Sequence, residues 1–119
     1  MAISLNAINN YFVGSSGCTF AGVVKAPDIY ITSDKRAKEN IIKIDNALEK
    51  LNKLNGYTFN YISSGESSGG VIAQELLDIM PGLVKFNSDT NYYSVQYNGL
   101  IALLIESVKE LAKQSGGGF

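Results

Sequence analysis

The sequence predicts an α+β fold: a short β-structured leader, a long helix, small β-hairpins and a C-terminal coiled-coil helix. Three observations predict it. Residues 1–32 are rich in small and β-branched residues with glycine breaks, two later segments space their apolar residues as helices do, and aromatic residues alternate with polar ones between those segments. At 119 residues the chain is long enough for one domain, or for a small domain with a leader.

The leader contains candidate strands at 10–13, 19–24 and 28–32. It carries too few long apolar side chains to form a core alone. We therefore expect it to be the end of a larger β-structured fibre, or to depend on other copies of itself. Cys18, the single cysteine, is expected to be a small buried hydrophobic residue.

A helix is predicted over residues 35–54. Ser33 and Asp34 supply N-cap chemistry. Apolar residues then recur at helical spacings, at Ile41, Ile44, Leu48 and Leu51. Asn55 and Gly56 form a pair suited to a left-handed C-cap, which would end the helix.

Short elements follow this helix. An aromatic strand is predicted over 57–61, a flexible loop over 63–70 and a short helix over 73–80, which Pro81 stops. Two further strands, 83–86 and 92–97, are separated by a polar turn and should pair as a hairpin.

The last element is a helix over about 98–114. Its apolar residues form a short coiled-coil seam: Ile101, Leu104, Val108 and Leu111. Because the other elements enclose little core, this seam indicates self-association. Its mixture of β-branched residues and leucine leans toward dimers, but two heptads are too few to specify a number.

Composition narrows the chemistry. The net charge is −1 without a long basic run, and no apolar stretch approaches the length of a membrane span, so we expect neither a nucleic-acid nor a membrane partner. The opening residues lack a secretory signal, which indicates synthesis in the cytoplasm. With no histidine and one cysteine, we expect no metal and no cofactor, and an enzyme of this sequence would need a carboxylate, tyrosine or lysine base.

Four segments carry a family resemblance. The first is Ser33-Asp34-Lys35-Arg36-Ala37-Lys38-Glu39-Asn40-Ile41. It is followed by Gly56-Tyr57-Thr58-Phe59-Asn60-Tyr61, by Gly70-Val71-Ile72-Ala73-Gln74-Glu75 ahead of Pro81, and by Val95-Gln96-Tyr97 leading into a leucine-rich helix. In order and spacing, residues 33–114 resemble the endosialidase-type intramolecular chaperones of phage tail spikes and tail fibres. Ala37 departs from that pattern, because the family usually carries leucine there.

The resemblance implies an intertwined homotrimer in which 33–119 is the chaperone domain and 1–32 is the fibre end. It also implies a single-turnover serine peptidase that cuts its own Thr32–Ser33 bond. Ser33 would be the nucleophile and Lys38 the general base, supported by Asp34, Arg36 and Asn40. A lysine accepts a proton only when neutral, and a water-poor setting favours that form.

Alternatives remain for the supporting residues. Asp34 could orient Lys38 or favour a helix N-terminus through the macrodipole. Arg36 could pair with a carboxylate or carbonyl of a neighbouring chain, or remain a surface residue. On one helix Ser33 and Lys38 would lie about 140° apart, so Ser33 must precede the helix if Lys38 is to reach it.

The predicted function is to trimerise, to hold the fibre or spike chain in register, and then to release itself. Assembly would occur in the host cytoplasm, and the domain would lie in the virion tail if retained. One alternative is an uncleaved structural fibre-tip protein of the same fold. A weaker one is a glycan-binding adhesin built on the tyrosines, although their alternation favours packing: Tyr57, Tyr61, Tyr92, Tyr93 and Tyr97.

Overall fold

The computed structural model describes residues 17–116 and divides the chain into two units, Met1–Ala37 and Lys38–Phe119. Among the described residues, the first unit contains one 3₁₀ turn, η1 (Lys35–Ala37). The described residues of the second form three helices, a further 3₁₀ turn and two antiparallel hairpins. This arrangement confirms the α+β class. The proposed boundary between 32 and 33 stays a prediction.

In the first unit, the described residues 17–32 form no strand, so the strands expected at 19–24 and 28–32 are not found. The strand expected at 10–13 lies outside the described residues. A strand needs a partner for its backbone N–H and C=O groups. The described residues of the first unit form no strand ladder, and large apolar side chains among them, such as Tyr30 and Val23, are exposed. Cys18 is exposed too, contrary to the expectation that it is buried.

The prediction of one long helix over residues 35–54 is wrong. Only α1 (Ala47–Asn52) is an α-helix, and residues 38–46 have no helix or strand. Asn40 and Asn46 adopt left-handed backbone angles, with φ of 54° and 48°, which interrupt a right-handed helix. Ile44 still packs against the core, so the apolar spacing was real, but it does not belong to one helix.

Glu110 determines where α1 begins. Its carboxylate accepts hydrogen bonds from the backbone N–H groups of Ala47 (2.8 Å) and Leu48 (3.1 Å). Asn46, the N-cap residue, makes no side-chain cap bond of its own. Glu110 lies on α3 (Tyr97–Gln114), so the long C-terminal helix supplies the cap of the short one. A six-residue helix is marginal alone, and this contact stabilises it.

Both hairpins are antiparallel, and the second of them is the one that the sequence predicted. The first pairs β1 (Tyr57–Asn60) with β2 (Ser67–Gly70), Phe59 lying opposite Ser68. Part of the predicted loop at 63–70 is therefore a strand. The second pairs β3 (Val84–Asn87) with β4 (Tyr92–Val95).

The start of β1 is tied to α2 (Ala73–Ile79) through a carboxylate. The Tyr57 hydroxyl donates to Glu75 at 2.6 Å, and the Asn55 side-chain amide donates to the same carboxylate at 3.1 Å. The Asn55–Gly56 pair does not form the left-handed cap that was expected, since neither residue has a positive φ.

η2 (Pro81–Leu83) follows α2, and Gly99 approaches Leu83 so closely that a Cβ would collide with its side chain.

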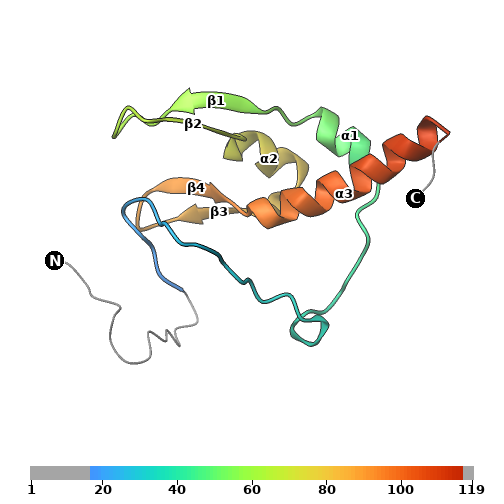
Figure 1. The fold of residues 1–119 in the computed structure, drawn as a ribbon, viewed down its shortest axis with the longest axis horizontal. Helices are drawn as coiled ribbons and strands as arrows, with labels where there is room; N and C mark the ends of the chain where they lie inside the picture. The colour runs from blue at the N-terminus through green and yellow to red at the C-terminus, as the bar shows by residue number, and fades with distance from the viewer. Residues whose placement is uncertain (1–16, 117–119) are drawn as a thin grey trace. The chain divides into compact units, whose positions relative to one another are not determined.

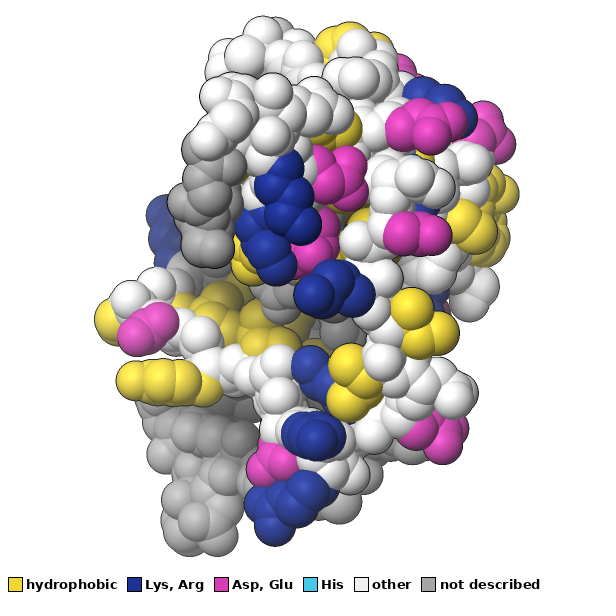
Figure 2. Space-filling view, turned by 90° about the vertical axis from the view of Figure 1, so that its right-hand side faces the viewer, with side chains coloured by type: hydrophobic (Ala, Val, Ile, Leu, Met, Phe, Trp, Pro, Cys, Tyr) yellow, Lys and Arg dark blue, Asp and Glu magenta, His cyan; other side chains and the backbone are white. Residues whose placement is uncertain are grey.

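The core of the second unit is small. Figure 1 shows α2 between the two hairpins and α1 beside the C-terminal half of α3. Among the described residues, the buried apolar side chains are Ala47, Leu76, Val84, Leu100 and Leu103. Many larger apolar side chains remain at the surface, and Figure 2 shows apolar side chains exposed among acidic and basic ones. One chain therefore leaves much of its apolar surface in water.

The Glu110 cap predicts a pH dependence. The bonds from Ala47 N–H and then Leu48 N–H lower the pKa of the Glu110 carboxyl below its ordinary value of 4.5. A lowered folded-state pKa gives stability that is present above the unfolded pKa and is lost as pH falls through the folded pKa. We expect Glu110→Gln to lower the melting temperature at pH 7 and to have less effect below about pH 4.

The matched control for that prediction is Glu66→Gln, an exposed carboxylate on the connection between β1 and β2. Thermal unfolding followed by circular dichroism at several pH values measures both variants. An equal loss of melting temperature at pH 7 and pH 3.5 for Glu110→Gln would contradict a role for the charged carboxylate.

Candidate functional site

The predicted cleavage residues lie around η1. Ser33 precedes this turn in chain without helix or strand, and Lys38 follows it. Ser33 belongs to the first unit and Lys38 is the first residue of the second. Residues 38–46 are not helical. Ser33 and Lys38 therefore do not share a helix, and the separation of about 140° that one helix would impose on them does not apply. The Ser33–Lys38 dyad and the Thr32–Ser33 bond remain predictions.

Asp34 and Arg36 form a local ion pair. The Asp34 carboxylate accepts from the Arg36 backbone N–H at 2.8 Å, from Nη2 at 2.9 Å and from Nε at 3.2 Å. The guanidinium, and next the backbone N–H, lower the pKa of the Asp34 carboxyl, and the same pair raises the pKa of Arg36. Asp34 therefore holds η1 in place through its hydrogen bonds with Arg36.

Within one chain Asp34 and Arg36 pair with each other, and the alternatives that involve Lys38 or a neighbouring chain stay predictions. Arg36 pairs with a carboxylate, but that of its own chain at a spacing of two residues. Asp34 binds the N–H of η1 as an N-terminal cap does, although the element is a 3₁₀ turn. The pair is solvent-exposed, so its contribution to stability is small. Asn40, the remaining supporting residue, is one of the left-handed positions that turn the chain toward α1.

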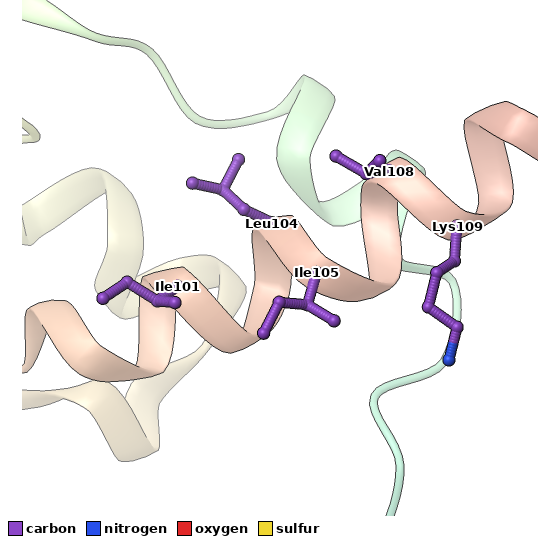
Figure 3. Close-up of a pocket in the computed structure, with 5 residues that line it drawn as sticks. All are labelled: Ile101, Leu104, Ile105, Val108 and Lys109. Atoms are coloured by element: carbon purple, nitrogen blue, oxygen red, sulfur yellow. The ribbon is translucent and has the colours of Figure 1, made fainter. Parts of the chain in front are cut away.

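The predicted seam on α3 is exposed along its length. Ile101, Leu104, Val108 and Leu111 are each about half exposed, between 47% and 56%. A shallow apolar groove of about 460 Å³ lies on α3. It is lined by Ile101, Leu104, Ile105, Val108 and Lys109, of which Ile105 is the apolar residue outside the seam. In Figure 3, Leu104 and Val108 project to one side of the helix and Lys109 to the other, with Ile105 between them.

A second, smaller pocket adjoins the seam. It has a volume of about 200 Å³ and lies between α1, the Gly56 turn and α3, with Leu51, Leu54, Val71 and Leu100 among its lining residues. Leu104 lines both this pocket and the groove on α3. The seam is therefore continuous with a hollow at the edge of the core.

Glu110 and Ile105 were not among the functional residues predicted from the sequence. The sequence contained a signal for Ile105, because the apolar run Leu100–Ile105 is longer than a single seam requires. Glu110 had no signal, since it acts on residues more than sixty positions earlier.

The tyrosines serve the hairpins rather than a closed core. Tyr93 and Phe86 form an edge-to-face pair with centroids 5.2 Å apart, as do Phe59 and Tyr61 at 5.3 Å. The Tyr97 hydroxyl accepts a bond from the Val71 backbone N–H at 3.2 Å. All five tyrosines of the set are at least 40% exposed, so the expected packing is not completed within one chain.

Among residues 17–116, no helix is long and apolar enough to span a bilayer. No three side chains of the acidic, cysteine or histidine types gather there as a metal ion would need.

Comparison with known proteins decides the family. Residues 33–85 match the family described as chaperone of endosialidase. The resemblance to the endosialidase chaperones is confirmed. The match begins at Ser33, the residue at which the sequence changes character, and it includes η1, α1, both strands of the first hairpin and α2.

Similar proteins occur among phage tail fibres. The chain is 39% identical over 97 residues to the long tail fiber protein Gp37 of Enterobacteria phage K3, an alignment that covers 75% of this chain. It is 31% identical over 104 residues to Gp37 of Salmonella phage S16, with 78% of this chain covered. The chain spans 8% and 14% of the length of these two relatives.

Proposed function

We propose that this endosialidase-type chaperone domain assembles as a homotrimer, holds three tail-fibre chains in register, and releases itself by cutting the Thr32–Ser33 bond. The observation that carries the proposal is the half-exposed apolar seam on α3 in a chain whose own core is small. The tail-fibre relatives support a fibre chain as the client. We place assembly in the host cytoplasm and the fibre in the virion tail.

Register is the physical problem that such a domain solves. A one-residue slip of a strand moves every side chain to the opposite face, and non-local pairing between chains is slow. The leader shows why a fibre end needs help, because its described residues form no strand in a single chain. A clamp that trimerises first brings three leaders together and reduces the entropy lost on pairing.

Self-cleavage would proceed through an ester. Lys38, when neutral, takes the proton of the Ser33 hydroxyl, and Oγ attacks the carbonyl carbon of Thr32. The Oγ–C bond forms and the C–N bond breaks, while the freed Ser33 amine takes the proton from the Lys38 ammonium. Water then hydrolyses the ester, leaving a carboxylate on Thr32 and restoring the Ser33 hydroxyl. Asp34 and Arg36 support this step by fixing the turn that follows Ser33.

We propose that assembly controls the chemistry. A lysine acts as a base only where its neutral form is favoured, and exclusion of water by neighbouring chains would supply that setting. Cutting would then follow correct assembly and leave the fibre without its nucleation device, in a kinetically trapped state.

The first test of this mechanism is the nucleophile. Denaturing mass spectrometry of the wild-type chain should find fragments 1–32 and 33–119, and Ser33→Ala should keep the chain whole with unchanged folding. Ser63→Ala, an exposed serine of the turn after β1, should be cut like the wild type. Cutting of the Ser33→Ala chain at the same bond would assign the attack to another group. An intact wild-type chain would favour a retained structural protein of the same fold.

The second test concerns the base. Lys38→Arg should abolish cutting, because a guanidinium stays protonated and cannot accept the serine proton. The rate of the wild-type chain should rise with pH as neutral lysine becomes more populated. Lys35→Arg is the matched control, since it makes the same exchange within η1. Normal cutting by Lys38→Arg would exclude the proton-acceptor role.

The third test joins assembly to cutting. Leu104→Asp places a carboxylate at an apolar contact of every copy, at a cost on the order of several kcal/mol, and should give uncut monomers or aggregates. Val108→Asp, a second seam variant, should do the same. Lys113→Asp, an exposed change outside the seam, should leave assembly and cutting nearly unchanged. Light scattering and denaturing mass spectrometry measure both properties, and efficient cutting by a folded Leu104→Asp monomer would uncouple them.

A further inference from the structure

The α3 helix has apolar residues on three faces. At 100° per residue, Leu100, Leu103 and Ser107 share the face that is buried in the core. The seam residues centre about 90° around the helix from that face. Ile105 lies about 80° beyond the seam centre, nearly opposite the core, and 54% of it is exposed. A trimer formed through the seam alone would leave Ile105 on its flank.

The groove on α3 marks this flank. Ile105 and Lys109 form the side of the groove that lies away from the seam, and Ile101 joins the flank to the seam. Figure 3 shows these residues on one helix, so a second wall must come from elsewhere.

The segment before α1 carries apolar side chains that need such a site. Ile41 and Ile42 are 63% and 82% exposed, although both belong to the unit that contains α3. They lie between the left-handed residues Asn40 and Asn46. The end of this segment is fixed to α3 because Glu110 binds the first two N–H groups of α1. Each copy therefore presents two adjacent exposed isoleucines a few residues before the point at which its chain is fixed to α3.

The area of the seam also calls for a further contact. An aliphatic side chain brings roughly 60–120 Å² of apolar surface when fully buried. Four half-exposed seam residues therefore fall several-fold short of the roughly 800 Å² per partner of a stable interface. Ile41, Ile42 and Ile105 together expose about as much of their surface as the four seam residues do. Burying them would therefore nearly double the apolar area that association removes from water.

We propose that Ile41 and Ile42 of one copy pack into the α3 groove of a second copy, against Ile105 and Ile101. This inference rests on the proposed assembly. Within one chain the isoleucines and the groove are both uncovered, so both are available to a second copy. The occupant stays with α3 after cutting at Thr32–Ser33, whereas the apolar residues of the leader do not. Because Ile41 lies three residues after Lys38, this contact would order the base only in the assembled protein.

Cross-linking between different chains tests the contact directly. Two full-length chains with tags of different size carry Cys18→Ser and Ser33→Ala, and one adds Ile42→Cys while the other adds Ile105→Cys. After co-expression and mild oxidation we expect a disulfide-linked heterodimer, formed at least about tenfold faster than between chains that meet only by collision. The matched control replaces Ile42→Cys by Ile62→Cys, at a fully exposed isoleucine on the turn after β1.

Three cross-linking results would overturn the inference. The first comes from a single chain that carries both Ile42→Cys and Ile105→Cys. If the disulfide forms only within that chain, the segment closes its own groove. The second is a cross-link of Ile105→Cys to Ile29→Cys in place of Ile42→Cys, which would make the leader the occupant. The third is equal cross-linking by the Ile62→Cys control.

An association measurement separates this inference from the proposed function. Ile41→Ser with Ile42→Ser should weaken assembly by about tenfold or more, while Ile62→Ser should leave it unchanged. Analytical ultracentrifugation over a concentration series in the Ser33→Ala background measures both. If the double variant assembles normally while Leu104→Asp does not, the groove has another occupant and the proposed function stands. If the parent chain is monomeric throughout, the proposed function fails as well.

Discussion

The α3 helix is apolar around more of its circumference than one chain can cover. Leu100 and Leu103 face the core, but Ile101, Leu104 and Ile105 remain half exposed a turn or less away. Exposed aliphatic surface of this extent is costly in water, and association is the means by which a small domain removes it. The small core, the exposed tyrosines and the absence of strands from residues 17–32 are all consistent with a chain whose fold is completed by other copies of itself.

Glu110 shows how strongly the rest of the second unit depends on α3. Its carboxylate replaces the N-cap that Asn46 does not supply, so the beginning of α1 is set by a residue on another helix. The same bonds fix the end of the segment that carries Ile41 and Ile42. A single carboxylate thus connects the long helix, the short helix and the apolar segment that we propose to be an interchain contact.

The two residues proposed for catalysis belong to different units. Ser33 lies in the first unit, which ends at Ala37, and Lys38 is the first residue of the second. The Asp34–Arg36 pair makes the intervening turn a defined element, but it is exposed and contributes little stability. The proposed base, Lys38, needs a water-poor setting that favours the neutral form of lysine, and neighbouring chains would exclude water. This is the physical reason for proposing that neighbouring chains control the cut.

The sequence by itself determined the short-range features. Alternation of aromatic residues marked β1, the turn residues marked the second hairpin, and Pro81 marked the end of α2, because strand alternation and turn chemistry depend on neighbouring residues. The motif from Ser33 to Ile41 also indicated the family. It could not give the start of α1, since Ile41, Ile44 and Leu48 have helical spacing whether or not residues 38–46 are helical. Only the tertiary structure decided this, through the Glu110 cap, and only packing decided which residues of the run Leu100–Ile105 face the core and which remain for a partner.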